Sequence, residues 1–284
     1  MAKIGIIGGS GLYNIDGLNN IKEVKVDTPF GDPSDSYITG SLEGIDVAFL
    51  PRHGKGHRIL PTELNYRANI YGFKKLGVEK IVSISAVGSF KKELKPLDIV
   101  LPDQFVDRTN QARKTTFFGE GIVGHISFAD PVCKDLKDMI YETTKELKLT
   151  THPKGTYLNM EGPAFSTRGE SLLYKSWGLD IIGMTNMPEA RLAREAEICY
   201  STVAFVTDYD CWHDEVVTID MVIANLTKNV ENAKKLIKKL APKLSKERTC
   251  SCKDTLKYAI ITDRKLIPEK TKKKLDIIIG KYIK

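Results

Sequence analysis

The chain opens with the stretch Lys3-Ile4-Gly5-Ile6-Ile7-Gly8-Gly9-Ser10-Gly11, an apolar run that passes directly into a glycine-rich turn. This pattern is typical of a short buried strand followed by a tight loop. Glycines let backbone N–H groups approach an anion closely, and the Ser10 hydroxyl adds a donor. The stretch lacks the Gly-Lys-Ser/Thr ending of a Walker A loop, and Asn14 stands where a dinucleotide fingerprint needs its third glycine. It therefore predicts a phosphate-binding loop, with an ordinary tight turn as the alternative.

The rest of the chain alternates short apolar runs with amphipathic stretches. We expect strands over 3–8, 46–51, 80–86, 98–101, 156–160, 180–184 and 200–207. We expect helices over 61–76, 131–147, 168–177, 188–197 and 218–240. Asp130 is the expected N-cap of the second helix, with Pro131 at its first helical position. This alternation predicts one α/β domain with a central mixed, partly parallel sheet flanked by helices, and ligands beyond the carboxyl ends of the strands.

Composition and charge narrow the class of protein. The chain has 284 residues, of which 42% are apolar, so it can bury a full core. Its net charge is +7, and residues 264–284 carry +6 of that, which leaves a nearly neutral body and argues against a nucleic-acid partner. With neither a signal peptide nor an apolar run near 20 residues, we expect a cytoplasmic protein without a membrane partner. Residues 1–260 form the expected domain, and 261–284 form a basic extension that is expected to be helical.

A second cationic loop follows the expected strand over 46–51. It reads Pro51-Arg52-His53-Gly54-Lys55-Gly56-His57-Arg58, and an arginine fork binds phosphate oxygens in pairs. A zinc site on His53 and His57 would need a third ligand, and the sequence offers no compact set that completes it. The alternative is a solvated basic loop. Small residues over 85–89 follow the next strand, where they would let the backbone reach a ligand or pack tightly against the sheet.

Two later strand ends carry further candidates. Phe165 stands in a Gly-Pro turn, where its ring can stack on a flat heterocycle or belong to the core. Asp208 and Asp210 directly follow a buried apolar strand, a costly position for two carboxylates that have no function. Their alternative role is capping or turn formation. Functionally, the pair could hydrogen-bond a heterocycle, and one acid with a raised pKa could donate a proton to a leaving-group nitrogen.

Together these segments resemble the purine nucleoside phosphorylase superfamily, in its trimer-type branch, and within it the members that act on methylthioadenosine. The resemblance runs from Lys3 to about Leu256. The motifs that carry it, in order and spacing, lie at 6–11, 27–31 (Asp-Thr-Pro-Phe-Gly), 51–54, 65–70 (Asn-Tyr-Arg-Ala-Asn-Ile), 103–107 (Asp-Gln-Phe-Val-Asp), 161–166 (Glu-Gly-Pro-Ala-Phe-Ser), 183–185 (Gly-Met-Thr) and 207–212 (Thr-Asp-Tyr-Asp-Cys-Trp).

The resemblance implies phosphorolysis of S-methyl-5′-thioadenosine to adenine and 5-methylthioribose 1-phosphate, with inorganic phosphate as co-substrate and without a cofactor or metal. It implies a phosphate site made by Ser10, Arg52, His53, Ala86 and Thr185. It places Met184 against the ribose, Phe165 on the purine, and Asp208 and Asp210 on the N7 and the 6-amino group. It implies a methylthio pocket from Ile219 and Val222, completed by His125 of a neighbouring subunit in a homotrimer or a dimer of trimers.

The two carboxyls also bear on the choice of base. An Asp at 208 can donate to N7 while a second group accepts from a 6-amino group, which favours adenine over 6-oxopurines. Gly183 departs from the Asn that animal members usually carry, and the tail after Ile260 is longer than expected for the family. Two alternatives stay open: a broader purine nucleoside or methylthioinosine phosphorylase, and a nucleic-acid-binding module that acts through the basic tail.

The five cysteines leave a separate question. Cys250-Ser251-Cys252 resembles a disulfide-forming Cys-X-Cys pair of thermophilic archaeal relatives, and the resemblance also implies a bridge at Cys133 and Cys199. Intracellular disulfides are rare outside hyperthermophiles, so reduced buried thiols are the alternative. A zinc site on the Cys-X-Cys pair is disfavoured at this point because the sequence shows no partner pair.

Overall fold

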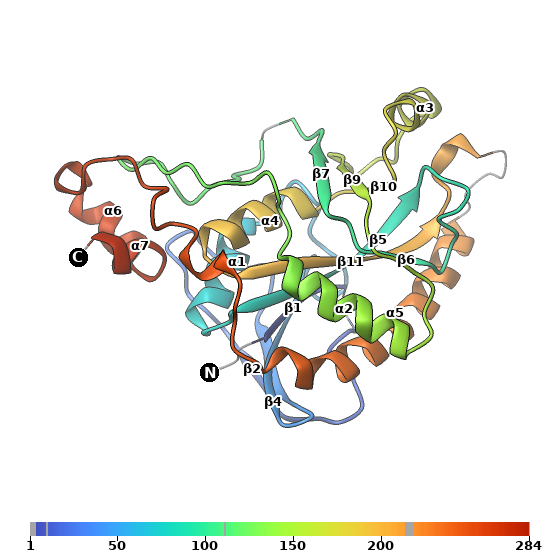
Figure 1. Ribbon diagram of the computed structural model, residues 1–284, viewed down its shortest axis with the longest axis horizontal. Coiled ribbons are helices and arrows are strands. Elements are labelled where there is room, and N and C mark those ends of the chain that lie inside the picture. The colour runs from blue at the N-terminus through green and yellow to red at the C-terminus, as the bar shows by residue number, and fades with distance from the viewer. Residues whose placement is uncertain (1–3, 10, 111, 214–218, 284) are drawn as a thin grey trace.

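The computed structural model describes residues 4–9, 11–110, 112–213 and 219–283, without the side chains of 219–223. Strand β1 (Ile4–Gly8) lies between β4 (Ile45–Pro51) and β5 (Lys80–Ser89) and runs parallel to both. The long strand β11 (Cys199–Asp208) pairs in parallel with the other side of β5 (Figure 1). The carboxyl ends of these four strands therefore face the same edge of the sheet.

The sheet extends beyond these strands on both sides. β2 (Leu18–Val24) and β3 (Tyr37–Leu42) add an antiparallel edge next to β4. Past β5 the sheet forks, and both branches contain antiparallel pairs. One branch holds β10 (Ile181–Gly183), β9 (Thr156–Asn159) and β7 (Gln104–Asp107), and the other passes through β11 to β6 (Ile99–Val100) and β8 (Thr151–His152). The predicted mixed, partly parallel α/β sheet is confirmed.

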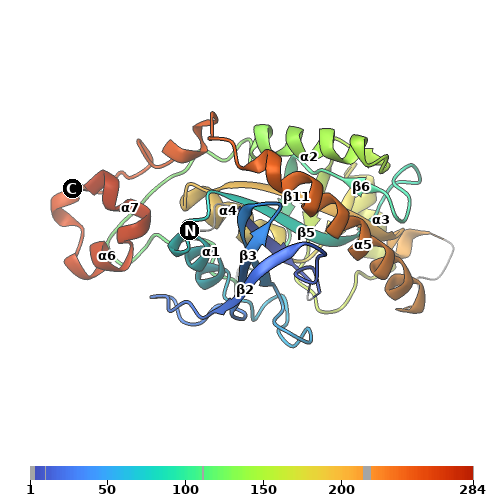
Figure 2. The ribbon, with the colours of Figure 1, turned by 90° about the horizontal axis from the view of Figure 1, so that it is seen from below.

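Helices cover both faces of the sheet because its central strands are apolar on both sides. In β4, Val47 and Phe49 belong to one buried cluster, while Ala48 and Leu50 belong to another, because successive side chains of a strand point to opposite faces of the sheet. On the first face pack α2 (Lys134–Glu146) and α5 (Ile219–Leu244), which lie side by side (Figure 2). On the second pack α1 (Tyr66–Lys75) and α4 (Asn186–Glu195).

The expected elements differ from the structure in identifiable places. Strands β2, β3, β7 and β8 were not expected, since three are short or exposed and β3 has no clear alternation. The expected start of the second helix is wrong. Helix α2 begins at Lys134, and its N-cap is Cys133 in place of Asp130. The backbone N–H of Cys133 donates to the Tyr200 carbonyl at 2.9 Å, which holds this residue extended against β11 and delays the helix.

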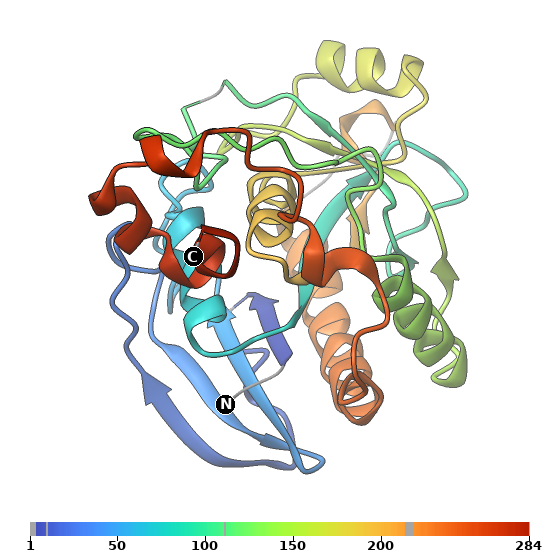
Figure 3. The ribbon, with the colours of Figure 1, turned by 60° about the vertical axis from the view of Figure 1, so that its left-hand side comes forward.

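The basic tail folds against the domain. This extension was expected to be helical, and it contains the short helices α6 (Glu269–Lys274) and α7 (Asp276–Ile283), of which α7 contacts α1 (Figure 3). Four of its apolar residues are buried in the cluster that also holds α1 and α4: Ile267, Leu275, Ile278 and Ile279. Lys274 pairs with Glu120, and Lys281 with Glu197, so part of the tail's charge is balanced within the chain. In the described residues we find no helix that is both long and apolar enough to span a bilayer.

The disulfides implied by the resemblance are absent from the described structure. Each of the five cysteines there is a free thiol. The Sγ atoms of Cys199 and Cys250 lie 3.3 Å apart, beyond the bond length of about 2.05 Å in a disulfide. Yet the fold brings Cys133, Cys199, Cys250 and Cys252 together, so the partner pair that the sequence did not reveal exists in space.

Candidate active site

A cavity of about 320 Å³ opens at the carboxyl ends of β1, β4, β5 and β11. The strand topology explains this position, because the loops that follow parallel strands meet at one edge of the sheet. Eight of the predicted site residues line it: Arg52, His53, Ala86, Phe165, Met184, Thr185, Asp208 and Asp210. Ser10 lies outside the described residues, but Gly9, which precedes it, lines the same cavity.

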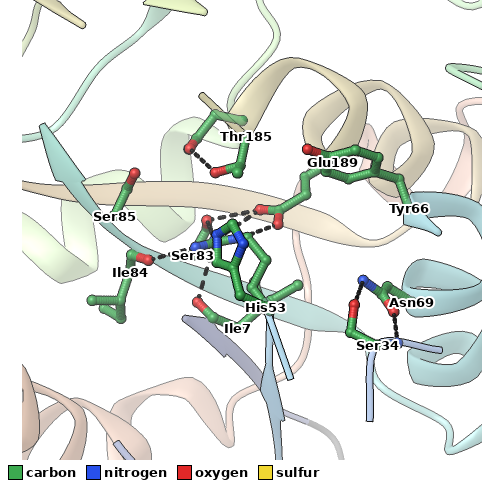
Figure 4. A network of polar contacts seen from close by, with 12 residues as sticks. Ile7, Ser34, His53, Tyr66, Asn69, Ser83, Ile84, Ser85, Thr185 and Glu189 are labelled. Atoms are coloured by element: carbon green, nitrogen blue, oxygen red, sulfur yellow. Dashed lines mark hydrogen bonds and ion pairs between the residues drawn. The ribbon is translucent and has the colours of Figure 1, made fainter. Parts of the chain in front are cut away.

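Arg52 follows β4 and is almost entirely buried. Its guanidinium pairs with Glu189 of α4, and it also donates to the Ser83 hydroxyl at 2.7 Å and the Ile84 carbonyl at 3.0 Å. Figure 4 labels these three partners. Glu189 is fully buried, and Ser83 and the Tyr200 hydroxyl also donate to it. The pair is electrically neutral, so Arg52 contributes directed N–H donors to the cavity wall rather than a free positive charge.

His53 lies next to Arg52 in the same wall of the cavity. Its Nδ1 is 2.8 Å from the carbonyl oxygen of Ile59, which can only accept, so this nitrogen carries the proton in the neutral ring. Burial, together with the neighbouring Arg52 charge, lowers the pKa of His53 to about 4. The ring of His57 stacks on it with 4.4 Å between centroids. His53 is therefore neutral at pH 7, with an unprotonated Nε2.

Thr185 places a helix end at the cavity. It is the N-cap of α4, and its hydroxyl makes no capping bond to that helix. The first N–H groups of a helix and its dipole favour an anion. Ala86 of β5 is exposed within a strand whose other residues are mostly buried, so backbone is accessible from the cavity there. The two cationic and glycine-rich loops thus meet a helix N-terminus at one end of the cavity.

Asp208 and Asp210 lie at the other end, after a register shift in β11. Asp208 accepts hydrogen bonds from the Thr207 hydroxyl at 2.7 Å and from the Asp210 N–H at 2.9 Å. Asp210 accepts from the hydroxyl of Ser171, which belongs to α3 (Arg168–Ser176), at 2.5 Å. Burial raises the pKa of both carboxyls. The pair therefore holds a proton more tightly than an exposed Asp would.

Apolar and aromatic side chains form the remaining walls. Phe165 is 72% exposed in this chain although it lines the cavity, so its ring is available to a ligand. Leu226 and Val230 of α5 also line the cavity, and the sequence analysis missed both. They follow positions 219 and 222 at helical spacing, and that periodicity was the available signal. Of the predicted Ile219 and Val222, the side chains lie outside the described residues.

His125 is placed apart from this cavity. Its side chain is exposed, and its backbone N–H donates to the Ala259 carbonyl at 2.8 Å. His125 is not one of the described residues that line the cavity.

The sequence analysis also missed two supporting residues. The buried guanidinium of Arg113 donates to the carbonyl oxygens of Glu161 and Met184, which ties the Phe165 loop to the end of β10. Tyr157 explains the glycine at 183, because a Cβ there would lie 1.9 Å from the tyrosine hydroxyl oxygen. An Asn at this position would require Tyr157 to move. Neither residue has a local sequence signal, since each acts through a distant contact.

Known proteins resemble this chain over nearly its whole length. The sequence model of the phosphorylase superfamily matches residues 3–242. An S-methyl-5′-thioadenosine phosphorylase of Geobacter sulfurreducens is 57% identical, with 99% of each chain covered, so the tail is shared and its length is not unusual. A methylthioadenosine phosphorylase from an antarctic soil metagenomic library superposes with a TM-score of 0.94 at 49% identity, with 98% of each chain covered.

A mutant adenosine/methylthioadenosine phosphorylase of Schistosoma mansoni, solved with adenine, gives a TM-score of 0.86 at 34% identity and covers 92% of this chain and 99% of its own. The matched family, the full-length identities and the shared fold lead to one assignment: the chain belongs to the S-methyl-5′-thioadenosine phosphorylase family of the phosphorylase superfamily.

Proposed function

We propose that this protein cleaves S-methyl-5′-thioadenosine with inorganic phosphate to give adenine and 5-methylthioribose 1-phosphate. One observation carries the proposal: a single cavity has two carboxyls of raised pKa at one end and an anion-binding end with Arg52, His53 and a helix N-terminus at the other. This arrangement fits a substrate that presents a nitrogen base to the carboxyls and its C1′ to a bound phosphate.

At the phosphate end, we assign binding to Ser10, Arg52, His53, Ala86 and Thr185. Because Glu189 neutralises Arg52, directed N–H and O–H donors and the α4 dipole hold the anion. The C1′–N9 bond breaks first and leaves positive charge on the ribose, which the bound phosphate stabilises. A phosphate oxygen then bonds to C1′, so no covalent enzyme intermediate, cofactor or metal is part of the proposed reaction.

At the base end, the departing purine needs a proton at N7. Burial raises the pKa of Asp208, which favours its protonated form, and we assign it as the donor, with Asp210 as acceptor for the 6-amino group. Phe165 stacks on the purine and Met184 lies against the ribose. The proton that phosphate loses on bonding to C1′ restores Asp208 through solvent, which balances the cycle.

At the 5′ end, the apolar Leu226 and Val230 continue the helix face of Ile219 and Val222. Such a wall buries a methylthio group, at about 0.8 kcal/mol per carbon. We further propose that His125, exposed in the single chain, completes this pocket in a neighbouring subunit of a trimer or a dimer of trimers. Light scattering should then give three or six times the 31.7 kDa of one chain.

The deciding experiment measures adenine release from methylthioadenosine with and without phosphate, with inosine as a second substrate. We expect release that requires phosphate and little cleavage of inosine. Release without phosphate would identify a hydrolase and overturn the assigned phosphate site. Comparable cleavage of inosine would retain phosphorolysis and overturn the assigned base selectivity.

Adenosine is the second candidate substrate, since a relative that is 34% identical carries both adenosine and methylthioadenosine in its name. Both substrates share adenine and differ only at the 5′ position, where the described walls are apolar. We therefore expect a kcat/KM for adenosine that is lower than that for methylthioadenosine in the same assay. A higher value for adenosine would mean that a polar group reaches the 5′ end.

A further inference from the structure

Four cysteine thiols meet on the side of the molecule opposite to the active-site edge. They come from three segments: Cys133 is the N-cap of α2, Cys199 begins β11, and Cys250 and Cys252 flank the start of the 3-10 helix η2 (Ser251–Asp254). All four Sγ atoms lie within 4.8 Å of one another. The Sγ of Cys250 is 3.3 Å from that of Cys199 and 3.8 Å from that of Cys133.

These separations match a metal site better than a disulfide. Four thiolates bound tetrahedrally to zinc at about 2.3 Å lie about 3.8 Å from one another, whereas bonded disulfide sulfurs lie at about 2.05 Å. A disulfide joins sulfurs in pairs, but here each of the four approaches the other three. We propose that Cys133, Cys199, Cys250 and Cys252 form a structural zinc site with four thiolate ligands.

The surroundings are suited to such a site. Cys133, Cys199 and Cys252 are buried, and Cys250 is partly buried, so the site is closed to solvent on most sides. The backbone already fixes the first two ligands, since the N–H of Cys133 donates to Tyr200 and that of Cys199 donates to Glu79 at 2.9 Å. The Cys-X-Cys segment then supplies both remaining ligands.

The charge of the site also has counterparts. Four thiolates and one Zn²⁺ carry a net charge of −2, which is costly to bury alone. Lys80 and Arg248 line the same depression as Cys133, Cys199 and Cys250, and Arg194 lines the neighbouring one with Cys133, Cys250 and Cys252. These three cations offset part of the charge of a zinc tetrathiolate, although Asp135 and Glu247 line the first depression as well and Arg248 also pairs with Glu79.

The proposed role is structural rather than catalytic. Cys199 begins β11 and Asp208 ends it, so a strand of ten residues, about 30 Å, separates the site from the carboxyls. The metal would fasten the segment that leaves α5 to the base of the sheet. A few residues further on, the same segment bonds to the chain around His125. The Ala259 carbonyl accepts from the His125 N–H, and the Ile261 N–H donates to the Val123 carbonyl at 3.1 Å. Zinc would thereby anchor the tail and steady the segment that carries His125.

Elemental analysis of the purified full-length protein tests the proposal. We expect one zinc per chain in wild type, loss of that zinc in the double variant Cys250→Ser/Cys252→Ser, and retention in Cys211→Ser. Cys211 is a matched control because its thiol donates to the Ser166 carbonyl, away from the cluster. Removal of zinc by a chelator should lower the melting temperature of wild type and leave the double variant unaffected.

A second measurement does not depend on the folding of a variant. Wild type is stripped of metal under reducing, oxygen-free conditions and titrated with Co²⁺. We expect the visible bands and the sulfur-to-cobalt charge-transfer band of a tetrahedral thiolate site. Both should saturate at one Co²⁺ ion per chain. Absence of both zinc and this spectrum would overturn the proposal. So would a mass and thiol count that show the four cysteines joined in disulfides.

Discussion

Asp208 combines burial with two hydrogen bonds from its own loop, and its chemistry can be tested by an isosteric change. Asp208→Asn removes the proton that the proposed mechanism gives to N7, so we expect kcat/KM for methylthioadenosine to fall by about 10²-fold. An amide can donate to a 6-oxo group, so the ratio of inosine to methylthioadenosine cleavage should rise. Steady-state kinetics on both substrates measure this. An unchanged ratio would contradict the selectivity argument, and an unchanged melting temperature serves as the folding control.

His53 makes phosphate binding depend on pH. Its pKa of about 4 in the ligand-free site will rise when an anion lies at Nε2, because the anion favours the imidazolium. Phosphate binding is then coupled to proton uptake, so we expect the KM for phosphate to increase as pH rises toward the pKa of the complex. His53→Gln should flatten that profile. The KM for the nucleoside, read in the same assays, is the control, and identical phosphate profiles in both proteins would contradict the coupling.

At the scale of elements, α3 depends on its first turn. Thr167 accepts from the Glu170 N–H, and the Glu170 carboxylate accepts from the Thr167 N–H, which forms a complete capping box. Thr167→Ala should cost about 1 kcal/mol of unfolding free energy in urea denaturation. Since α3 holds Ser171 against Asp210, the KM for the nucleoside should rise as well. Thr167→Ser keeps the cap and should match wild type, and equal losses in both variants would contradict the capping argument.

Helix α4 ends with a carboxyl whose titration affects stability. Glu195 is buried, accepts from Thr116 and from the Phe117 N–H, and has a pKa raised by burial to about 7. Because the folded pKa exceeds the unfolded one, this stabilisation is complete below about pH 4.5 and is lost as pH rises through 7. Relative to Glu195→Gln, wild type should lose up to about 3 kcal/mol over that range.

Denaturation midpoints between pH 5 and 8 measure this difference. Glu231→Gln, at an exposed position of α5, is the matched control and should follow wild type at every pH. Parallel curves for wild type and Glu195→Gln would contradict the assigned titration.

At the scale of the whole molecule, the tail is part of the core. Ile279 of α7 is fully buried in the cluster shared with α1 and α4. Ile279→Ala should therefore lower the unfolding free energy by about 2–5 kcal/mol. Lys273→Ala, on the exposed side of α6, should stay within about 0.5 kcal/mol of wild type. Equal effects of the two changes, measured by urea denaturation, would mean that the tail unfolds separately.

The packing of the tail against the domain also argues against a nucleic-acid role for it. Its apolar face is buried, and Lys272, Lys274 and Lys281 each pair with a carboxylate. The remaining positive charge of the tail lies on its solvated surface. Composition alone could not distinguish a nucleic-acid-binding tail from a tail packed against the domain, because it does not tell which lysines lie near acids.

Local patterns determined the strands that build the active-site edge and the loops that follow them. The runs that became β1, β4, β5 and β11 are apolar and end in glycine, cationic or acidic residues, so the positions of Arg52, His53 and Asp208 follow from chain order and parallel pairing. The family also follows from motifs in sequence order. These features are local, and local pattern is what a sequence displays directly.

Tertiary structure alone decided how distant residues meet. Glu189 neutralises Arg52 across 137 residues, and Cys250 reaches Cys133 across 117. The sequence gives no sign of either contact, because each depends on how helices pack across the sheet and where the tail returns. Arg52 alone predicts a free cation, and an isolated Cys-X-Cys pair argues against a metal. Packing reverses both interpretations, since the charge, hydrogen bonding and coordination of a buried group are set by its neighbours in space.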